Sequence, residues 1–384
     1  MATNNNDKTL NVPHLRFPEF TGEWRYSFLN EYLEENKERN KKGLFDKTTV
    51  LSVSGDFGIV NQIRLLGRSF AGKSVLDYHV VRYGNIVYTK SPLKEYPYGI
   101  VKINNGVDGI VSTLYAVYNV KSNASGCFIE NYFALPRRTN KYFKPIVRIG
   151  AKHDMKISNE EAIANVVCFP QYAEQQKIAE FLSLIDDRIV SQNKIIEKLE
   201  SLIRGIYKTL LGESDQYRYL DELCEIKKGV QVNKEELSEK GLYYVMNGGI
   251  TPSGYYDLYN TEANTISISE GGNSCGYVQY NYTPFWSGGH CYTLENISDV
   301  VDDRYLFHYL KANELQIMSL RIGSGLPNIQ KKDLSAFRIP LPALNKQINI
   351  AKALDALLYK ITVDKNIYST YKQQKEYLLQ QMFI

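Results

Sequence analysis

Paired cysteines, long apolar runs and catalytic motifs are all missing from this sequence. Its 384 residues include five cysteines, an odd number with no Cys-x-x-Cys spacing. Such scattered thiols favour a reducing compartment and argue against a disulfide framework or a zinc site. No stretch approaches the roughly 20 apolar residues of a membrane helix, and the polar first residues lack the apolar core of a secretory signal. We therefore expect a cytoplasmic protein with no membrane partner.

Motifs for chemistry are equally scarce. The chain has no Asn-Pro-Pro-Tyr motif for amino-methylation and no Gly-x-Gly-x-x-Gly cofactor loop. Its five histidines stand apart from any metal-ligand spacing. We accordingly predict no catalytic residue, no metal ligand and no cofactor bound by this chain.

One segment is an exception, because Gly67–Ser74 matches the phosphate-binding loop pattern Gly-x-x-x-x-Gly-Lys-Ser in full. That chemistry requires a strand before the loop and a helix after it, so that backbone amides and the helix dipole meet the phosphates. The following segment, 75–85, is β-branched and aromatic, which disfavours a helix. We interpret the segment as a polar loop whose Arg68, Lys73 and Ser74 are available to contact phosphate groups. An NTP-binding enzyme stays open as an alternative, which loss of nucleotide binding in Lys73→Ala would favour.

Charge is distributed unevenly along the chain. Residues 23–170 carry 21 Lys and Arg against 14 Asp and Glu, a net charge of +7. Residues 215–342 carry 11 against 16, a net charge of −5. The first balance is typical of a nucleic-acid binder, and the second is not.

The chain repeats itself over two stretches of 42 residues, 170–211 and 342–383. With an offset of 172, Pro170 aligns with Pro342 and Gln175 with Gln347. Apolar residues then recur at spacings of 4 and 3 in both copies, which over four or more heptads predicts a coiled coil. The apolar seam residues are Ile178, Leu182, Ile185, Ile189, Ile196, Leu199, Ile203, Ile206 and Leu210 in the first copy, and Ile350, Leu354, Leu357, Ile361, Tyr368, Tyr371, Leu378 and Met382 in the second.

Each copy predicts a helix of about 35–40 residues, or roughly 55 Å at 1.5 Å per residue. The same seam step is polar in both copies, Gln192 in one and Asp364 in the other, which is typical of a device that sets register. The simplest way to bury both seams is to pack the two helices on each other as an antiparallel pair. Two unrelated helices, each packed on its own domain, stay open as the alternative.

The segments before the helices correspond only loosely. Trp24–Leu29 resembles Tyr217–Leu223, and Arg148-Ile149-Gly150 parallels Arg321-Ile322-Gly323. Short β-prone runs such as Thr48–Ser54 and Val111–Val120 alternate with glycine and asparagine. The expected fold class is α+β, with two mixed, β-rich domains separated by two long antiparallel coiled-coil helices in a pseudo-two-fold repeat. The expected parts are an N-terminal segment (1–22), a first domain (23–169), a central helix (170–212), a second domain (213–341) and a C-terminal helix (342–384).

This organisation resembles the specificity subunits of type I restriction–modification systems. Residues 11–24 (NVPHLRFPEFTGEW) are similar to the opening of Gram-positive members, and residues 170–179 (PQYAEQQKIA) to the opening of the family's helices. The second domain resembles a common recognition-domain type through YVMNGGITPSGY at 244–255, SEGGNSCGY at 269–277 and GSGLPNIQKKDL at 323–334. The resemblance spans nearly the whole chain, and no single motif carries it.

The resemblance implies a non-catalytic subunit that recognises a bipartite double-stranded DNA target, with one half-site per domain and a spacer set by the helices. It further implies two adenine-methyltransferase subunits and restriction/translocase subunits as partners, with S-adenosylmethionine, ATP and Mg bound by those partners. A related system, in which one fused methyltransferase–nuclease chain is the partner, stays open.

DNA contacts need Lys, Arg, hydroxyl and amide groups on loops. In the first domain the candidates are Arg39, Lys41, Lys42, Gln62, Arg64, Arg68, Lys73, Ser74, Arg137, Arg138 and Lys141. In the second domain they are Lys227, Lys228, Gln231, Asn233, Asn328, Gln330, Lys331 and Lys332. For the acidic second domain we hypothesise a basic rim facing the DNA groove and an acidic back.

Overall fold

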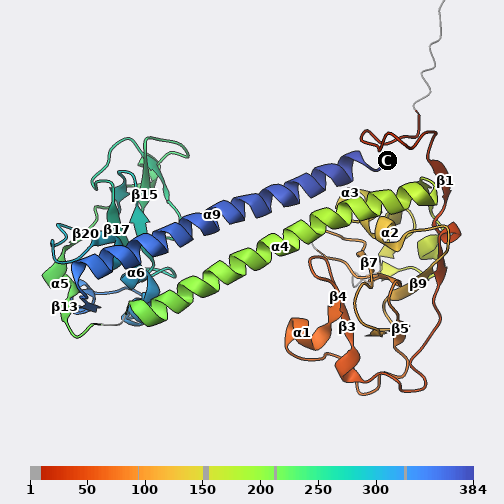
Figure 1. The fold of residues 1–384 in the computed structure, drawn as a ribbon, viewed down its shortest axis with the longest axis horizontal. Coiled ribbons are helices and arrows are strands. Elements are labelled where there is room, and N and C mark those ends of the chain that lie inside the picture. Colours follow the sequence, from red (N-terminus) through yellow and green to blue (C-terminus); the bar gives the residue numbers. More distant parts are fainter. Residues whose placement is uncertain (1–9, 94, 150–154, 212–213, 324–326) are drawn as a thin grey trace, which may run out of the picture. The chain divides into compact units, whose positions relative to one another are not determined.

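Two long helices and two β-rich domains make up the computed structural model, which describes residues 10–93, 95–149, 155–211, 214–323 and 327–384 (Figure 1). The chain divides into two compact units. The first comprises residues 1–191 together with 368–384, and the second comprises residues 192–367. The expected α+β class with two domains and two long helices is confirmed. The C-terminal helix is nevertheless shared, because its last turns belong to the first unit.

The long helices are α4 (Tyr172–Leu210) and α9 (Leu344–Gln381). Within each unit their segments run antiparallel (Figure 1). Every seam residue whose side chain is described is buried or half-buried, and the side chain of Leu210 lies outside the described residues. The seam therefore lies where the 4,3 spacing places it, between the helices and against the domains.

The first unit contains short strands and helices ahead of α4. Its strands are β1 (Arg25–Phe28), β2 (Leu33–Glu35), β3 (Leu51–Ser54), β4 (Gly58–Asn61), β5 (His79–Val81), β6 (Ile86–Tyr88), β7 (Val101–Ile103), β8 (Gly109–Val111), β9 (Ala116–Val120), β10 (Arg148–Ile149), β11 (Met155–Lys156) and β12 (Val166–Phe169). Its helices are α1 (Gln62–Leu66), α2 (Gly126–Tyr132) and α3 (Pro136–Phe143), with one-turn helices η1 (Leu29–Glu31), η2 (Lys47–Thr49) and η3 (Glu161–Ile163). In the β-prone run 111–120, β8 ends at Val111 and β9 begins at Ala116, and between them the Tyr115 amide donates to the Ser112 carbonyl in a turn.

The second unit contains an equivalent set between α4 and α9. Its strands are β13 (Tyr217–Tyr219), β14 (Glu225–Lys228), β15 (Tyr243–Met246), β16 (Gly254–Tyr256), β17 (Thr265–Ser269), β18 (Val278–Asn281), β19 (Trp286–Ser287), β20 (Cys291–Glu295) and β21 (Arg338–Pro340). Its helices are α5 (Leu220–Leu223), α6 (Asp303–Ala312), α7 (Glu314–Ser319) and α8 (Lys331–Ser335), with the one-turn helix η4 (Lys234–Glu236).

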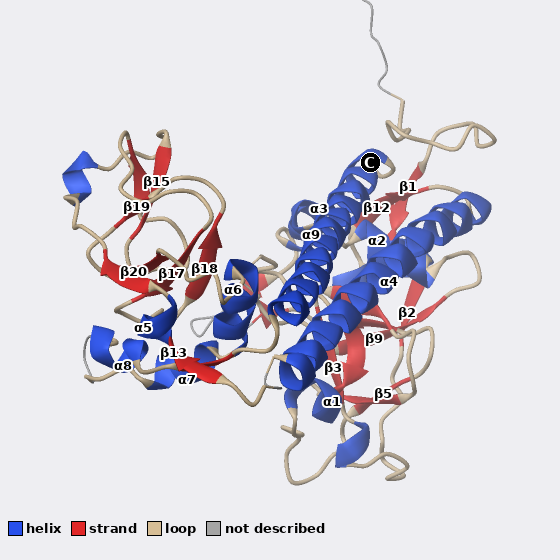
Figure 2. Ribbon diagram, turned by 60° about the vertical axis from the view of Figure 1, so that its left-hand side comes forward, coloured by secondary structure: helices blue, strands red, loops and turns tan. Residues whose placement is uncertain are grey.

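The two domains also repeat one another in the order of their strands. A four-stranded antiparallel sheet has the order β2-β9-β6-β7 in the first unit and β14-β20-β17-β18 in the second, so its strands, numbered along the chain, lie 1-4-2-3 in both. Helix α2 packs on β7, and α6 packs on the equivalent β18. Figure 2 shows these sheets with the helices beside them. The units differ in the additional sheets, since β5 pairs antiparallel with β8 whereas β15 pairs parallel with β19.

A two-stranded ribbon opens each domain. The two ribbons correct the alignment of Trp24–Leu29 with Tyr217–Leu223 that the sequence suggested. Leu29 and Leu220 are both buried, and their amides donate to Asn165 and Phe337 respectively. Strand β1 pairs with β12, and β13 pairs with β21. Trp24–Leu29 therefore matches residues 215–220, two positions earlier than the Tyr217–Leu223 match expected from the letters.

A buried glutamine at the start of each long helix joins it to its domain. The Gln175 side chain accepts from the Ser125 amide at 3.0 Å and donates to the Pro170 carbonyl at 3.0 Å. Ser125 is the N-cap of α2. Gln347 accepts from the amide of Asp302, the N-cap of α6, at 2.9 Å and donates to the carbonyl of Pro342 at 2.8 Å.

The polar seam step joins the two repeats directly. Gln192 Nε2 donates to Asp364 Oδ1 at 2.8 Å, and both side chains are buried. These residues are equivalent under the 172-residue offset, so the helix pair has a local two-fold axis at this contact. Lys360 Nζ, one turn earlier on α9, lies 2.8 Å from the same carboxylate oxygen.

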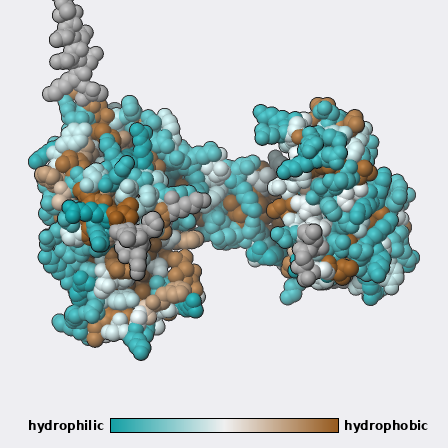
Figure 3. Space-filling model, turned by 180° about the vertical axis from the view of Figure 1, so that it is seen from behind, coloured by the Kyte–Doolittle hydropathy of each residue, from teal (hydrophilic) through white to brown (hydrophobic). Residues whose placement is uncertain are grey.

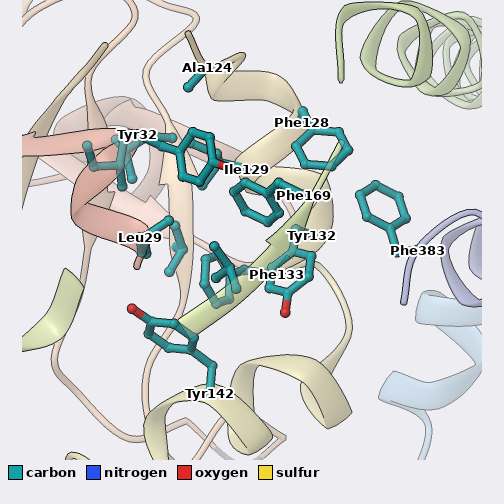
Figure 4. Close-up of a cluster of buried hydrophobic side chains, with 14 of the residues drawn as sticks. Leu29, Tyr32, Ala124, Phe128, Ile129, Tyr132, Phe133, Tyr142, Phe169 and Phe383 are labelled. Carbon is teal, nitrogen blue, oxygen red and sulfur yellow. The ribbon is translucent and has the colours of Figure 1, made fainter. Parts of the chain in front are cut away.

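Aromatic residues dominate the core of the first unit. Phe128 packs edge-on against Phe169 at 5.0 Å, and the ring of Phe383 lies 5.1 Å from Phe128. Figure 4 shows Phe383 facing this cluster from the end of α9. The face of the molecule in Figure 3 is mostly hydrophilic, broken by smaller hydrophobic patches. The described helices include none that is long and apolar enough to cross a bilayer.

Candidate nucleic-acid interface

A buried carboxylate collects several polar side chains of the second unit. Glu270 follows β17, and its side chain is 7 % exposed. Its Oε1 lies 2.6 Å from Lys228 Nζ and accepts a hydrogen bond from the Tyr292 hydroxyl at 3.3 Å. Its Oε2 lies 3.4 Å from His290 Nδ1. Burial together with the Glu270 carboxylate raises the pKa of Tyr292 to about 12, so this phenol keeps its proton and remains a donor at neutral pH.

Sheet order explains why these residues meet. Strand β20 lies between β14 and β17, and Tyr292 on β20 pairs with Lys228 on one side and Ile268 on the other. Glu270 comes two residues after Ile268, just beyond the end of β17. Cross-strand neighbours are close enough for their side chains to interact, so the register itself brings Lys228, Tyr292 and Glu270 together.

Glycines allow the surrounding loops to touch. A Cβ on Gly229 would lie 2.3 Å from the Gly288 carbonyl oxygen, and a Cβ on Gly288 would lie 2.8 Å from the Asn247 side chain. Gly248 has a φ of +77°, in the left-handed region that favours glycine. The Asn247 side chain accepts from the His290 amide at 3.0 Å. Three glycine-containing loops therefore pack against one another around Glu270.

The segment after residue 326 joins the same place. The Ile329 amide donates to the Glu270 carbonyl at 2.9 Å, and Asn328 forms a β-bridge with Gly271. Gln330 donates to the Asn328 side chain at 3.0 Å. The structure thus brings together the predicted residues Lys228, Asn328 and Gln330, which are up to about a hundred positions apart in the sequence.

The other second-unit candidates are exposed, and several are engaged locally. Lys227 lies 3.3 Å from Glu295, Gln231 donates to the Val232 carbonyl at 2.9 Å, and Asn233 donates to Glu236 at 2.8 Å. Lys331 and Lys332 lie exposed in the first turn of α8.

In the first unit, two candidate clusters form one surface region. Asn40 donates to the Val75 carbonyl at 3.2 Å, so the loop that carries Lys73 packs beside the segment that carries Lys41 and Lys42. Lys41 pairs with Asp77, and Arg39 donates to the Asp77 carbonyl at 3.0 Å. Lys42, Arg64, Arg68 and Lys73 are exposed here, as is Ser74, whose hydroxyl accepts from the Leu76 amide at 3.3 Å.

Gln62 serves the loop itself. Its side-chain oxygen accepts from the Phe70 amide at 2.7 Å, and its amide donates to Ser52 at 3.2 Å. The Arg68 guanidinium lies 4.6 Å from the centroid of the Phe70 ring. Gln62 therefore orders the loop rather than facing outward, whereas Arg68 lies over an exposed ring.

The phosphate-loop pattern at Gly67–Ser74 lacks the geometry that its chemistry requires. Helix α1 precedes the loop and ends at Gly67, which has a φ of +75°. The segment after Ser74 runs through a turn into β5, so no helix N-terminus points at the loop. The local fold gives no support to the NTP-binding alternative.

Arg138 is a correction to the predicted DNA contacts. It donates to the carbonyl of Tyr132 at 3.0 Å and to that of Leu379 on α9, and it lies 4.8 Å from the Phe383 ring. Burial lowers its pKa to about 10, and it remains charged at neutral pH. Its donors hold the end of α9 against the domain, whereas Arg137 and Lys141 on the same helix are exposed.

Sequence comparison now adds to this geometry. A family model described as "Type I restriction modification DNA specificity domain" matches residues 214–372. Curated type I specificity subunits of Mycoplasma pneumoniae and Mycoplasma genitalium are 38% and 36% identical over 144 and 139 residues. Residues 214–372 are therefore similar to the DNA specificity domain of type I restriction–modification systems. These matches cover 37% and 36% of this chain and 38% and 36% of the length of those relatives.

The fold of this chain is also found in solved structures. The crystal structure of the type I system S subunit from M. genitalium superposes with a TM-score of 0.69 at 17% identity, covering 97% of this chain and 99% of that one. A chain from a structure of the type I restriction–modification system superposes with a TM-score of 0.55 at 16% identity. At this identity the likeness concerns the fold.

Glu270 and His290 were not predicted as site residues from the sequence. Carboxylates are poor candidates for a polyanionic ligand, and a lone histidine carries little signal. The available signal was the glycine-rich run 269–277 itself, since closely spaced glycines indicate loops that approach other backbone. Among the described residues, no group of three His, Cys, Asp or Glu side chains is arranged to hold a metal ion.

Proposed function

We propose that this chain is the DNA-reading subunit of a type I restriction–modification complex and performs no chemistry itself. Each domain recognises one half of a split double-stranded DNA target. The long helices set the number of base pairs between the halves. The observation that supports this most directly is the repeated 1-4-2-3 sheet carrying different loops in the two units, because one frame with unlike loops suits two unlike half-sites.

The partners in this proposal are two adenine-methyltransferase subunits and restriction/translocase subunits, and the protein works in the cytoplasm. S-adenosylmethionine, ATP and Mg are bound by those partners. A related arrangement, with methylation and cleavage on one fused chain, would use this subunit in the same way. Co-purification of the tagged chain separates the two, since it yields either separate methyltransferase and translocase chains or one long chain.

Methylome sequencing tests the proposed function. Genomic DNA is sequenced by a single-molecule method from cells that carry the methyltransferase with this chain, and from cells that carry the methyltransferase alone. The expected result is a split motif with methylated adenine in both halves that appears only when the chain is present. Identical methylation in the two cell lines would refute the proposal.

The role of the helices as a spacer has its own test. Seven residues are inserted between Ile196 and Leu199 and seven between Leu357 and Ile361, which leaves the Gln192 contact intact. Each heptad adds about 10 Å, or about three base pairs at 3.4 Å per pair. The preferred spacer should lengthen by about three base pairs while both half-sites stay the same. The control is insertion into α4 alone, which puts the seams out of register and should abolish methylation. An unchanged spacer in the double insertion would contradict this role.

A further inference from the structure

Glu270 is an unexpected residue among the predicted DNA contacts Lys228, Asn328 and Gln330. DNA carries one negative charge per about 1.7 Å of helix axis, so a carboxylate near it is repelled. Glu270 is nonetheless buried, and its Oε2 is buried without a hydrogen-bond partner among the described residues. Burying an incompletely paired carboxylate is costly, and its presence requires a compensating role.

The groups around Glu270 suggest what that role is. Lys228 and His290 contact the carboxylate, yet their side chains are 52 % and 63 % exposed. A lysine ammonium has three donors, and Glu270 needs only one of them. The carboxylate therefore holds the Lys228 ammonium by an ion pair, and the His290 ring lies beside it at 3.4 Å without a hydrogen bond, with donors of both groups left for a ligand. A flexible lysine held in this way loses less conformational freedom on binding.

We propose that Glu270 is a positioning residue of the DNA interface, which holds Lys228 and His290 against hydrogen-bond acceptors of the target. This inference rests on the proposed function of the chain. The acceptors are either phosphate oxygens or the O6 and N7 atoms of guanine, and both present the same chemistry to these donors.

The test is whether Glu270→Gln strengthens or weakens DNA binding. If Glu270 were only a nearby negative charge, removing it would strengthen DNA binding. If it positions Lys228 and His290, Glu270→Gln weakens binding by about ten-fold even though the protein becomes more positive. Binding is measured with the full chain in its methyltransferase complex and a duplex carrying the motif found by methylome sequencing.

Two kinds of control protect this reading. Glu295→Gln removes a carboxylate that pairs with Lys227 at the surface of the same unit, and its affinity should be unchanged or higher. His290→Ala removes an exposed side chain without disturbing the core, and it should weaken binding several-fold. A misfolded Glu270→Gln protein is recognised by its thermal unfolding, and His290→Ala then still decides the question.

A double-mutant cycle shows whether Glu270 acts through Lys228. In a Lys228→Met background, Glu270→Gln should cost no further affinity, because the group that it positions is gone. Equal and independent losses would overturn the inference. A duplex with a scrambled second half-site identifies the acceptor, since a phosphate contact weakens both duplexes equally and a guanine contact weakens only the intact motif.

The outcomes distinguish the two levels of the argument. Wild-type complex that binds no duplex refutes the proposed function, and the role of Glu270 falls with it. Wild-type complex that binds the motif, together with Glu270→Gln binding as tightly or more tightly, overturns the positioning role alone.

Discussion

The paired glutamines at the start of the long helices give a quantitative test of the repeat. Gln175 is fully buried. Replacing it by leucine leaves the Ser125 amide and the Pro170 carbonyl without their hydrogen-bond partner inside the protein. Each buried group left without a partner costs about 1–3 kcal/mol, and the leucine recovers a little by apolar burial. We expect Gln175→Leu to lower the free energy of unfolding by about 2–4 kcal/mol.

The second copy should respond in the same way but in the other unit. Gln347→Leu removes the hydrogen-bond partner of the Asp302 amide and of the carbonyls of Pro342 and Val300. Its cost should match that of Gln175→Leu within about 1 kcal/mol, because the contacts are equivalent. Hydrogen exchange should show faster opening around residues 123–128 for the first variant and around 300–306 for the second.

Gln176→Leu is the matched control, since Gln176 is the exposed neighbour on the same helix turn. Its effect on unfolding, measured by urea or heat, should stay within about 0.5 kcal/mol. A loss below about 1 kcal/mol for Gln175→Leu, or exchange that changes in the wrong unit, would refute the idea that these glutamines clamp the helices to their domains.

Three further variants test single residues. Arg138→Ala should lower the free energy of unfolding by about 2–4 kcal/mol and expose the end of α9 to hydrogen exchange. Arg137→Ala, the control on the same helix, should change the free energy of unfolding by less than about 0.5 kcal/mol. Equal losses of stability in the two variants would contradict the buried role of Arg138. Burial lowers the pKa of His79 to about 4, so the unfolded chain takes up a proton near pH 6.5 before the folded one does, and stability falls as pH drops through that range. Unfolding at pH 7.5 and 5 should show about 2 kcal/mol of this loss in the wild type and not in His79→Leu. The Lys360 ammonium, with Gln192, lowers the pKa of Asp364. The wild type should therefore be more stable than Asp364→Asn at pH 7, and this difference in stability should fade as pH falls below about 4. A difference that persists at pH 2.5 would contradict this prediction.

The helical frame was predictable because its information is local. Seam residues recur every three or four positions, so a helix and its buried face follow from neighbours in the sequence. The equivalence of Gln192 and Asp364 could also be recognised from the amino-acid sequence. Their hydrogen bond was not, because it depends on the antiparallel pairing of two segments that lie 172 residues apart.

The sheets were only partly predictable. The β-prone run Thr48–Ser54 contains β3, but nothing local shows that β20 pairs with both β14 and β17. Pairing partners are set by long-range packing, which a single sequence does not display. For the same reason the loosely similar segments at Trp24 and Tyr217 were aligned two positions out of register until the ribbons and buried leucines aligned them.

The acidic balance of the second domain shows why a charge count is a poor guide to its surface. The count of −5 treats every carboxylate as free, yet Glu270 is buried and pairs with Lys228. Asp303 accepts from the Tyr280 hydroxyl at 2.5 Å. A carboxylate that orients a lysine lowers the count by one while making that lysine a better ligand for an acceptor on DNA. Net charge therefore understates a surface on which a buried carboxylate holds a lysine in place, and the Glu270→Gln experiment measures that difference directly.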